Sequence, residues 1–339
     1  MLSKQLIVTE PGHIELQDRA IDDTLQPHEA LVRAEYTIVS AGTEGAGFTG
    51  LVKEMPFGDE GHYPRNTGYG HIGEVLEVGT EVSSCKVGDR VLSFSNHCSV
   101  IKADVGRMAL PMPENTDGTR LVFARMAGVS IGALRSSSVQ AGETVLIIGM
   151  GLVGNFAAQL FRMAGAEVMA ADLSNLRLAK ARACGIERTV NPNETDLKDA
   201  VMAWTDGNGV HVAVEAIGNS HVINEAALLT RRYGEIILLG SPRARATYDV
   251  TPMLLHIHLE AIRMIGALEW RWPYHESERH WSLLDNYRQI ARWITEERLI
   301  VDPLLTHLAS PSDCQQIYEG LTQNQDTYLG AVFDWSLIK

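Results

Sequence analysis

Short apolar or alternating segments, separated by turn residues, fill the N-terminal part of the chain. Glu29–Tyr36, Gly73–Val78, Arg90–Phe94 and Ser99–Lys102 have the length and the pattern of β-strands. Turn residues, such as the pair Gly88-Asp89, lie between them. The pattern predicts a compact, barrel-like domain of mixed β structure.

From residue 144 onward, strand-sized apolar runs alternate with segments of helical periodicity. The predicted strands are Thr144–Ile148, Glu167–Ala171, Val210–Val214, Glu235–Leu239 and Ala261–Ala267, and the predicted helices are Val153–Ala164, Leu176–Cys184 and Ser220–Leu229. Such alternation is typical of a doubly wound parallel sheet with helices on both faces.

Helical spacing also predicts a helix over Arg120–Ser137, which leads into the parallel-sheet region. After that region, a helix over His280–Glu297 and a strand over Leu329–Asp334 return the chain to the first domain. We therefore expect an α/β protein of two domains, one formed by residues 1–137 and 277–339 and the other by residues 138–276.

Composition excludes several kinds of partner. The 339 residues are 45% hydrophobic, and 29 Lys and Arg against 42 Asp and Glu give a net charge of −13, with no basic run for nucleic acid or anionic membrane. No apolar stretch approaches the ~20 residues of a membrane span, and the four cysteines contain no C-x2-C pair. We expect a cytoplasmic protein that acts on a small molecule and has no structural zinc lobe.

A glycine loop follows the first predicted strand of the parallel sheet. Gly149–Gly154 fits G-x-G-x-x-G and leads directly into a helix, the context that gives the pattern its meaning. Gly149 permits the tight turn, Gly151 lets the backbone approach a pyrophosphate, and Gly154 lets the helix pack closely. With Leu152 and Val153 at the start of the helix, the loop predicts a dinucleotide site in a Rossmann domain.

An acidic residue ends the next strand. Asp172 lies 18 residues past Gly154, where its carboxylate can accept hydrogen bonds from both ribose hydroxyls and would repel a 2′-phosphate. This favours NAD over NADP, although Arg177 follows five residues later and offsets part of the negative charge. The alternative is that Asp172 only caps the helix that begins near Ser174.

Two further turns follow buried strands at the same edge of the predicted sheet, where open α/β sheets bind ligands. We predict cofactor contacts from Ile217, Gly218, Gly240 and Ser241 in these turns, and from Leu173 beside the acidic residue. The alternative for such glycines is that they serve only the turn.

The order and spacing of several motifs resemble those of the medium-chain dehydrogenase/reductase superfamily, the alcohol and polyol dehydrogenase relatives. The motifs are Val39–Glu44, Gly68–Val75, Val78-Gly79, Gly88–Val91 and the glycine loop, so the resemblance covers nearly the whole chain. It implies a GroES-like catalytic domain, a Rossmann domain within it, an active site in the cleft between them, and a homodimer or homotetramer joined through the strand near Ala261–Ala267.

The chain departs from its zinc-dependent relatives at the metal ligands. Their cysteine ligand falls on Ala41 here, and Tyr69 stands at the ligand position in the segment where they carry a His-Glu pair. The third ligand position falls near Ala127, in a segment without a donor side chain. Because catalytic zinc needs three protein ligands, we predict a zinc-free enzyme.

Without zinc, side chains must take the hydroxyl proton of an alcohol and stabilise charge on its oxygen. Thr43 matches the hydroxyl that passes this proton to solvent in the zinc relatives, while the next relay position falls on Ala46. Glu44 is a candidate base or a structural carboxylate, and Tyr69 is a candidate hydrogen-bond partner of the reacting oxygen. His71 is interpreted as a buried histidine.

Other polar clusters carry weaker hypotheses. Lys53, His62 and Tyr63 lie in or near a loop that could set substrate choice. His256 and His258 diverge on a helix and do not suggest a metal site, whereas the aromatic run Trp270–Tyr274 suits either a pocket wall or a subunit interface.

The leading hypothesis is a zinc-independent, NAD-dependent oxidoreductase that interconverts a secondary alcohol and a ketone, with a sugar- or polyol-like substrate implied by the resemblance. One alternative is an NADPH-dependent quinone or enone reductase, against which Gly149 and Asp172 argue. The other is a non-catalytic nucleotide-binding protein, against which the polar residues at positions 43, 44, 69 and 71 argue.

Overall fold

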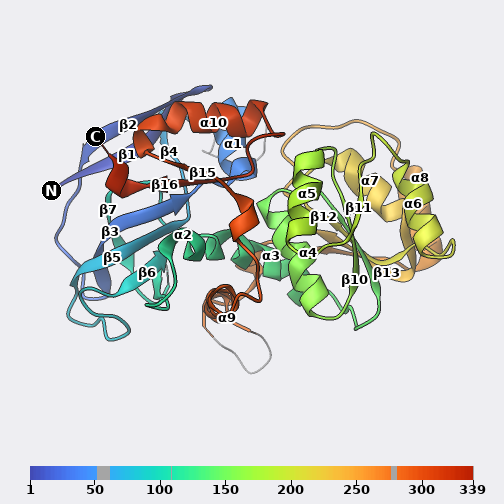
Figure 1. The fold of residues 1–339 in the computed structure, drawn as a ribbon, viewed down its shortest axis with the longest axis horizontal. Helices are drawn as coiled ribbons and strands as arrows, with labels where there is room; N and C mark the ends of the chain where they lie inside the picture. The colour runs from blue at the N-terminus through green and yellow to red at the C-terminus, as the bar shows by residue number, and fades with distance from the viewer. Residues whose placement is uncertain (52–61, 108, 276–280, 339) are drawn as a thin grey trace. The chain divides into compact units, whose positions relative to one another are not determined.

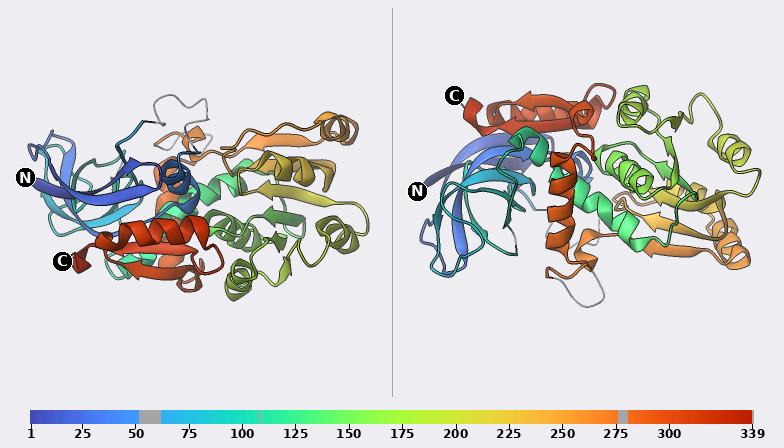
Figure 2. Two further views of the ribbon diagram at one scale, coloured as in Figure 1. Left: turned by 90° about the horizontal axis from the view of Figure 1, so that it is seen from above. Right: turned by 60° about the horizontal axis from the view of Figure 1, so that its bottom comes forward.

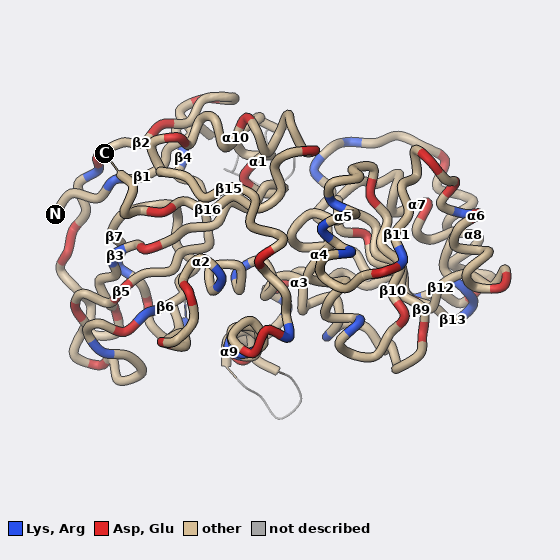
Figure 3. The backbone as a smooth tube through the Cα atoms, in the orientation of Figure 1, with Lys and Arg blue, Asp and Glu red and all other residues tan. Residues whose placement is uncertain are grey.

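The computed structural model describes residues 1–51, 62–107, 109–275 and 281–338. The chain divides into two compact units. Unit 1 comprises Met1–Met126 and Trp272–Lys339, and unit 2 comprises Ala127–Arg271. Both termini therefore belong to unit 1 (Figure 2). Lys and Arg residues are interspersed with Asp and Glu residues along both units (Figure 3).

Unit 2 is built on a parallel sheet with the order β11-β10-β9-β12-β13-β14 (Figure 1). Its strands are β9 (Thr144–Ile148), β10 (Glu167–Ala171), β11 (Arg188–Val190), β12 (Val210–Glu215), β13 (Thr230–Leu238) and β14 (Arg263–Gly266). The chain starts in the centre at β9, runs to one edge and then returns to build the other half, which is the Rossmann strand order. The predicted doubly wound parallel sheet is confirmed.

Two separate cores explain why the strands of unit 2 are continuously apolar. Val145 and Ile147 of β9 point to a core formed with α3 (Ala124–Ser136), α4 (Leu152–Met163) and α5 (Asn175–Ala183). Leu146 and Ile148 point to the opposite core, formed with α6 (Leu197–Trp204) and α7 (Ser220–Leu228). Because side chains alternate across a strand, helices on both faces bury every position. Helix α8 (Thr251–Glu260) packs on the half of the sheet that holds β13.

Unit 1 contains a larger mixed sheet and a smaller antiparallel one. The larger sheet has the order β15-β16-β3-β5-β6-β8, with β7 also paired to β3. Its strands are β3 (Glu29–Ile38), β5 (His71–Val78), β6 (Arg90–Ser93), β7 (Val100–Asp104), β8 (Ala109–Pro111), β15 (Leu305–Ala309) and β16 (Gly330–Asp334). The smaller sheet consists of β1 (Leu2–Glu10), β2 (His13–Ala20) and β4 (Arg65–Asn66).

The helices of unit 1 connect these sheets. They are α1 (Ala41–Thr49), α2 (Gly118–Leu121), α9 (Leu283–Thr295) and α10 (Cys314–Gln323), with short 3-10 turns at Asp302–Leu304, Pro311–Asp313 and Trp335–Leu337, and a further one at Glu269–Arg271 in unit 2. A common core joins β1 to α1 and α10 through Leu6, Phe48 and Tyr318. The two helices lie side by side in Figure 1.

The structure corrects some of the predicted elements. The single helix predicted over Arg120–Ser137 is interrupted between α2 and α3, and Ala261 ends α8 with a φ of 52° instead of opening the last strand. The segment around Thr43, for which no element was predicted, forms helix α1. Among the described residues, no helix has the length and apolarity needed to cross a bilayer.

Candidate nucleotide-binding and catalytic sites

The glycine loop of unit 2 requires glycine at its first and last positions. Gly149 has a φ of +97°, and a Cβ there would lie 2.5 Å from Cγ1 of Ile217. A Cβ on Gly154 would lie 1.8 Å from the carbonyl oxygen of Gly149. Helix α4 therefore packs against the end of β9 so closely that no side chain fits between them.

Gly151 differs from these two glycines because a side chain at this position would point into open space. It is the N-cap of α4, its φ is −63°, and no described heavy atom lies within 4 Å of a Cβ built on it. No side chain caps the first turn, in which Leu152 is buried and Val153 partly buried. An open approach to backbone N–H groups at a helix N-terminus fits the pyrophosphate of a dinucleotide.

Asp172 lies at the carboxyl end of β10 and is hydrogen-bonded to the backbone of the glycine loop. Its Oδ2 accepts a hydrogen bond of 2.6 Å from the backbone N–H of Met150, and its Oδ1 accepts one of 2.8 Å from Ser174. The N-cap of α5 is Ser174 and not Asp172. A carboxylate has about four acceptor positions, so these two bonds leave capacity for ribose hydroxyls.

Two more of the predicted cofactor residues flank this carboxylate. Nη1 of Arg177 lies 3.7 Å from Oδ2 of Asp172, which places a guanidinium beside the acid. Leu173, next along the chain, is 63% exposed at this edge of the sheet.

The turns after β12 and β13 lie against each other and against the glycine loop. A Cβ on Gly218 would lie 2.2 Å from the carbonyl oxygen of Ser241, and one on Gly240 would lie 2.2 Å from the backbone nitrogen of Gly218. Ile217 lies next to Gly149 and is 52% exposed. The structure thus brings these predicted cofactor residues together at one edge of the sheet.

Glu215, which the sequence analysis missed, organises the first of these turns. It ends β12 with no exposed surface, and its Oε1 accepts hydrogen bonds from the N–H groups of Ile217 and Gly218, each 2.8 Å long. Burial raises the pKa of Glu215, against the effect of these hydrogen bonds. The available signal was a charged residue directly after the predicted strand Val210–Val214.

In unit 1, Glu44 lies inside a network of donors. It is 5% exposed; its Oε1 accepts from the Ser40 N–H at 2.7 Å, and its Oε2 interacts with His97 Nε2 at 2.9 Å. Thr67 and Tyr318 also donate to Oε2. Burial raises the pKa of Glu44, but the His97 charge and these hydrogen bonds outweigh burial and hold the pKa below its usual range.

Tyr69 connects two hydroxyl groups at the start of helix α1. Its phenol donates a hydrogen bond to Oγ of Ser40, the N-cap of α1, and also bonds to the side chain of Thr43. Thr43 is exposed, Tyr69 is partly buried and Ser40 is buried. Burial raises the pKa of Tyr69, and the charge of Arg125 opposes this rise.

His71 and His97 occupy the interior behind this group. Neither has exposed surface, and burial together with the nearby His97 lowers the pKa of His71 to about 4. His71 is therefore neutral near pH 7. The structure places it away from solvent, as the interpretation of a buried histidine requires.

The residues at the expected catalytic metal position do not fit zinc. Ala41 has no donor atom, the Tyr69 phenol is bonded to Ser40, and Ala127 is buried and also lacks a donor. Within the described residues, no group of three or more His, Cys, Asp or Glu side chains is arranged to hold a metal ion.

The remaining predicted residues make other contacts or are exposed. Tyr63 donates to the carbonyl oxygen of Gly47, and His256 lies 3.0 Å from the carbonyl oxygen of Thr230. His62 and His258 are exposed, and Trp270 is 45% exposed. Lys53 lies outside the described residues.

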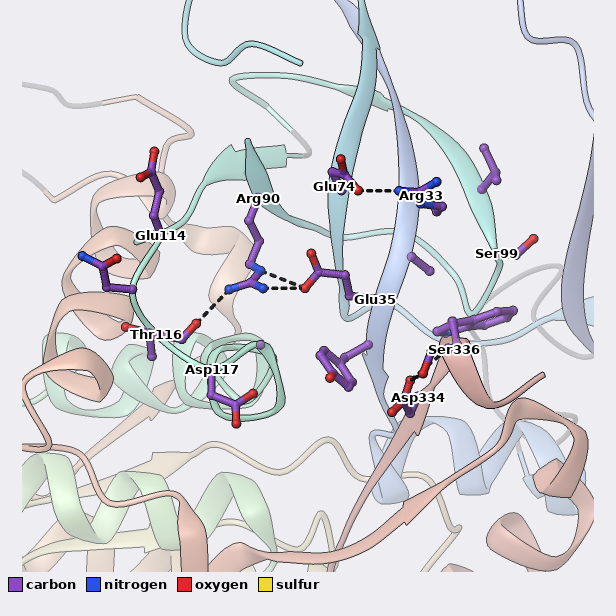
Figure 4. Close-up of a pocket in the computed structure, with 16 residues that line it drawn as sticks. Arg33, Glu35, Glu74, Arg90, Ser99, Glu114, Thr116, Asp117, Asp334 and Ser336 are labelled. Atoms are coloured by element: carbon purple, nitrogen blue, oxygen red, sulfur yellow. Dashed lines mark hydrogen bonds and ion pairs between the residues drawn. The ribbon is translucent and has the colours of Figure 1, made fainter. Parts of the chain in front are cut away.

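Unit 1 also has an open cavity of about 720 Å³ beside β3 (Figure 4). Two ion pairs lie in its lining: Arg90 Nη2 lies 2.8 Å from Glu35 Oε2, and Arg33 pairs with Glu74. Arg90 also donates to the carbonyl oxygen of Thr116. The cavity lining includes none of the predicted cofactor or catalytic residues.

Comparison with known proteins identifies the class. Residues 26–146 match the family model of the alcohol dehydrogenase GroES-like domain, and residues 153–281 match that of the zinc-binding dehydrogenase. The chain belongs to the medium-chain dehydrogenase/reductase superfamily of pyridine-nucleotide oxidoreductases. Its GroES-like and Rossmann-like domains are the ones that the resemblance implied.

Two curated relatives act on polyols or sugars according to their names. A sorbitol dehydrogenase from Halalkalibacterium halodurans is 27% identical over 275 residues, which cover 70% of this chain and 76% of that protein. A D-guloside 3-dehydrogenase from Shigella flexneri is 27% identical over 260 residues, covering 69% and 72%. A dehydrogenase from Sinorhizobium meliloti 1021, crystallised with NADP, has the same fold, with a TM-score of 0.81, 18% identity and coverage of 98% and 99%.

Proposed function

We propose that this protein is an NAD-dependent, zinc-independent oxidoreductase that interconverts a secondary alcohol and a ketone, with a sugar- or polyol-like substrate. The observation that carries the proposal is the glycine loop, in which Gly151 leaves open space at the start of α4 and the preceding Met150 N–H donates to the Asp172 carboxylate. The polyol and sugar relatives support the substrate class.

The nucleotide would accept or return a hydride, and unit 2 holds it. The N-terminus of α4 would hold the pyrophosphate, and Asp172 would accept hydrogen bonds from the adenosine ribose. The exposed Leu173 and Ile217 offer apolar surface to rings of the nucleotide. Arg177 supplies the positive charge through which NADP would compete with NAD.

In this proposal, hydroxyl groups of unit 1 carry out the proton transfer. Tyr69 exchanges a proton with the reacting oxygen, and its bonds to Thr43 and Ser40 orient the phenol. Thr43, exposed at the start of α1, connects this group with solvent.

Glu44 takes a positioning role in this proposal. A lowered pKa makes the carboxylate a weak base, and the surrounding donors occupy both of its oxygens. It holds the first turn of α1, which carries Thr43, against His97 and Tyr318.

The test is a steady-state assay with NAD and NADP in parallel over sugars, polyols, hydroxy-lactones and simple secondary alcohols. We expect NAD reduction with a polar secondary alcohol and a higher kcat/KM for NAD than for NADP. Oxidation of NADPH by quinones or enones, without alcohol oxidation, would favour the reductase alternative. Tight nucleotide binding without turnover on either panel would favour a non-catalytic protein.

A further inference from the structure

A buried arginine lies beside Tyr69. Arg125 is 1% exposed, its Nε donates a hydrogen bond of 2.8 Å to the Tyr69 carbonyl oxygen, and its guanidinium carbon is 4.5 Å from the centroid of the Tyr69 ring. The positive charge is therefore fixed against the residue that we propose for proton transfer.

Aromatic side chains enclose this guanidinium. Its carbon lies 4.7 Å from the Phe94 ring centroid and 5.5 Å from that of Tyr287, and Nη1 donates to the Tyr287 hydroxyl. Burying a cation costs free energy unless its surroundings stabilise the charge. The ring faces do this through their negative quadrupoles and leave Arg125 a single well-defined position.

The Arg125 side chain and a metal-ligating residue at position 70 exclude each other. A Cβ on Gly70 would lie 2.9 Å from Cγ of Arg125 and 2.7 Å from Cγ2 of Ile38. Tyr69 and Gly70 stand where the zinc-dependent relatives carry their His-Glu pair. A fixed guanidinium at this position would also repel a divalent cation.

We propose that Arg125 replaces the catalytic metal as the source of positive charge and stabilises the phenolate form of Tyr69. The inference rests on the proposed function. Arg125 acts through Tyr69 and is a positioning residue. In alcohol oxidation, the substrate O–H bond breaks and its proton bonds to the phenolate oxygen of Tyr69, while the C–H electron pair leaves as hydride to NAD. In ketone reduction the same steps run in reverse.

The pKa of Tyr69 lies above its ordinary value because the phenol is buried, and the charge of Arg125 limits this rise. This charge is the largest influence that lowers the pKa of Tyr69. An opposite charge close to an ionising group favours its charged form and typically moves its pKa by about one unit or more. Removal of the Arg125 charge should therefore leave Tyr69 protonated to a higher pH.

The experiment compares wild type with Arg125→Met, Arg125→Lys and, as a matched control, Arg33→Met, an exposed arginine of the same unit paired with Glu74. The direct readout is the phenolate absorbance of Tyr69 against pH, obtained by subtracting the spectrum of Tyr69→Phe. The second readout is the pH profile of kcat/KM for alcohol oxidation.

In Arg125→Met we expect the Tyr69 titration and the rising limb of kcat/KM to move to higher pH by about one unit, and kcat near neutral pH to fall about tenfold. Arg125→Lys should retain most of the effect, and Arg33→Met should match wild type. If Arg125→Met does not fold, we compare wild type with Arg125→Lys and with Tyr287→Phe, which removes the hydroxyl bonded to Nη1. In these two variants we expect the Tyr69 titration to move to higher pH by a smaller amount.

Unchanged Tyr69 titration in Arg125→Met would overturn the inference, as would, if that variant does not fold, unchanged titration in both Arg125→Lys and Tyr287→Phe. The absorbance readout does not depend on turnover. If no alcohol is oxidised, the proposed function fails, while the coupling between Arg125 and Tyr69 is still measured.

Discussion

In the proposed function, Asp172 is the residue that most directly sets nucleotide choice. Asp172→Ala removes the acceptor for the ribose hydroxyls and the repulsion of a 2′-phosphate, and it leaves Arg177 beside the pocket. We expect the Kd for NAD to rise roughly tenfold or more while the Kd for NADP changes less or falls, because hydrogen bonds to charged groups contribute about 1.5–3 kcal/mol.

Nucleotide titrations followed by fluorescence measure both constants. Asp172→Asn is the matched control, because the amide keeps an acceptor but loses the charge. Equal weakening of NAD and NADP would refute the role assigned to Asp172, as it would show that the residue only fastens Met150 and Ser174.

Tyr69 lies at the centre of the proposed proton transfer. Tyr69→Phe removes the hydroxyl and keeps the ring that faces Arg125. At saturating NAD we expect kcat to fall by roughly 100-fold, in the range typical of general acid–base groups, with an unchanged Kd for NAD. Tyr36→Phe, a partly buried tyrosine of the same unit, should have normal kcat. Unaltered turnover in Tyr69→Phe would assign proton transfer to another group.

His71 makes the folded state sensitive to acid. Its pKa is about 4 in the folded chain and 6.5 in the unfolded chain, so between these values the unfolded state binds one more proton. Stability therefore decreases as the pH falls from 6.5 to about 4, by roughly 3 kcal/mol over the whole window.

His71→Leu removes this contribution, whereas His13→Leu, a change at an exposed histidine, does not. We expect the Tm of His71→Leu to fall less between pH 7 and pH 4 than the Tm of wild type or of the control. Parallel Tm profiles for all three proteins would show that His71 does not titrate as its burial implies.

At the scale of elements, substitutions at the junction of β9 and α4 distinguish effects on nucleotide binding from effects on folding. Gly151→Ala places a methyl group in open space on a φ of −63° that alanine adopts easily. We expect an unchanged Tm and a Kd for NAD at least tenfold higher, because the methyl group blocks the approach of the pyrophosphate. Normal affinity of Gly151→Ala for NAD would show that the pyrophosphate does not bind at this position.

Gly154→Ala serves as the opposite control. Its Cβ would lie 1.8 Å from the Gly149 carbonyl oxygen, so α4 must move away from β9. We expect a loss of several degrees in Tm, or failure to fold.

Sequence patterns predicted the elements of unit 2 better than those of unit 1, for a physical reason. Strands such as β9 are buried on both faces and are continuously apolar, which makes them conspicuous. The hairpin of β1 and β2 carries polar residues on its exposed face, and the sequence analysis predicted neither strand. Helix α1 begins at Ala41 among three glycines, so its propensity is poor and its tertiary contacts with α10 fix it.

The candidate sites followed the same division. The glycine loop and Asp172 are local in sequence and were predictable. The partners of Tyr69 and Glu44 come from distant segments, such as Arg125 and Tyr318, and no local pattern announces them.

At the scale of the whole molecule, we propose a homodimer through the edge of the Rossmann sheet. Strand β14 ends the strand order, and α8 before it exposes apolar side chains: Leu254 is 54% exposed, Leu255 53% and Leu259 59%. Exposed apolar patches of this kind mark interaction surfaces.

The double variant Leu255→Glu with Leu259→Glu places charges on one face of α8. We expect a dimer for wild type and a monomer for this variant in sedimentation velocity, while Leu337→Glu, at an exposed leucine of unit 1, should leave the dimer intact. A dimeric double variant, or a monomeric wild type, would reject this interface.

The central claim is that side chains, and not a metal ion, carry the chemistry of this dehydrogenase. The most direct measurement is NADH formation by protein dialysed against EDTA, with the zinc content of the same sample determined by mass spectrometry. We predict turnover of a secondary alcohol at the same rate before and after dialysis, with far less than one zinc ion per chain. Loss of activity on dialysis and its recovery on addition of one zinc ion per chain would contradict the account.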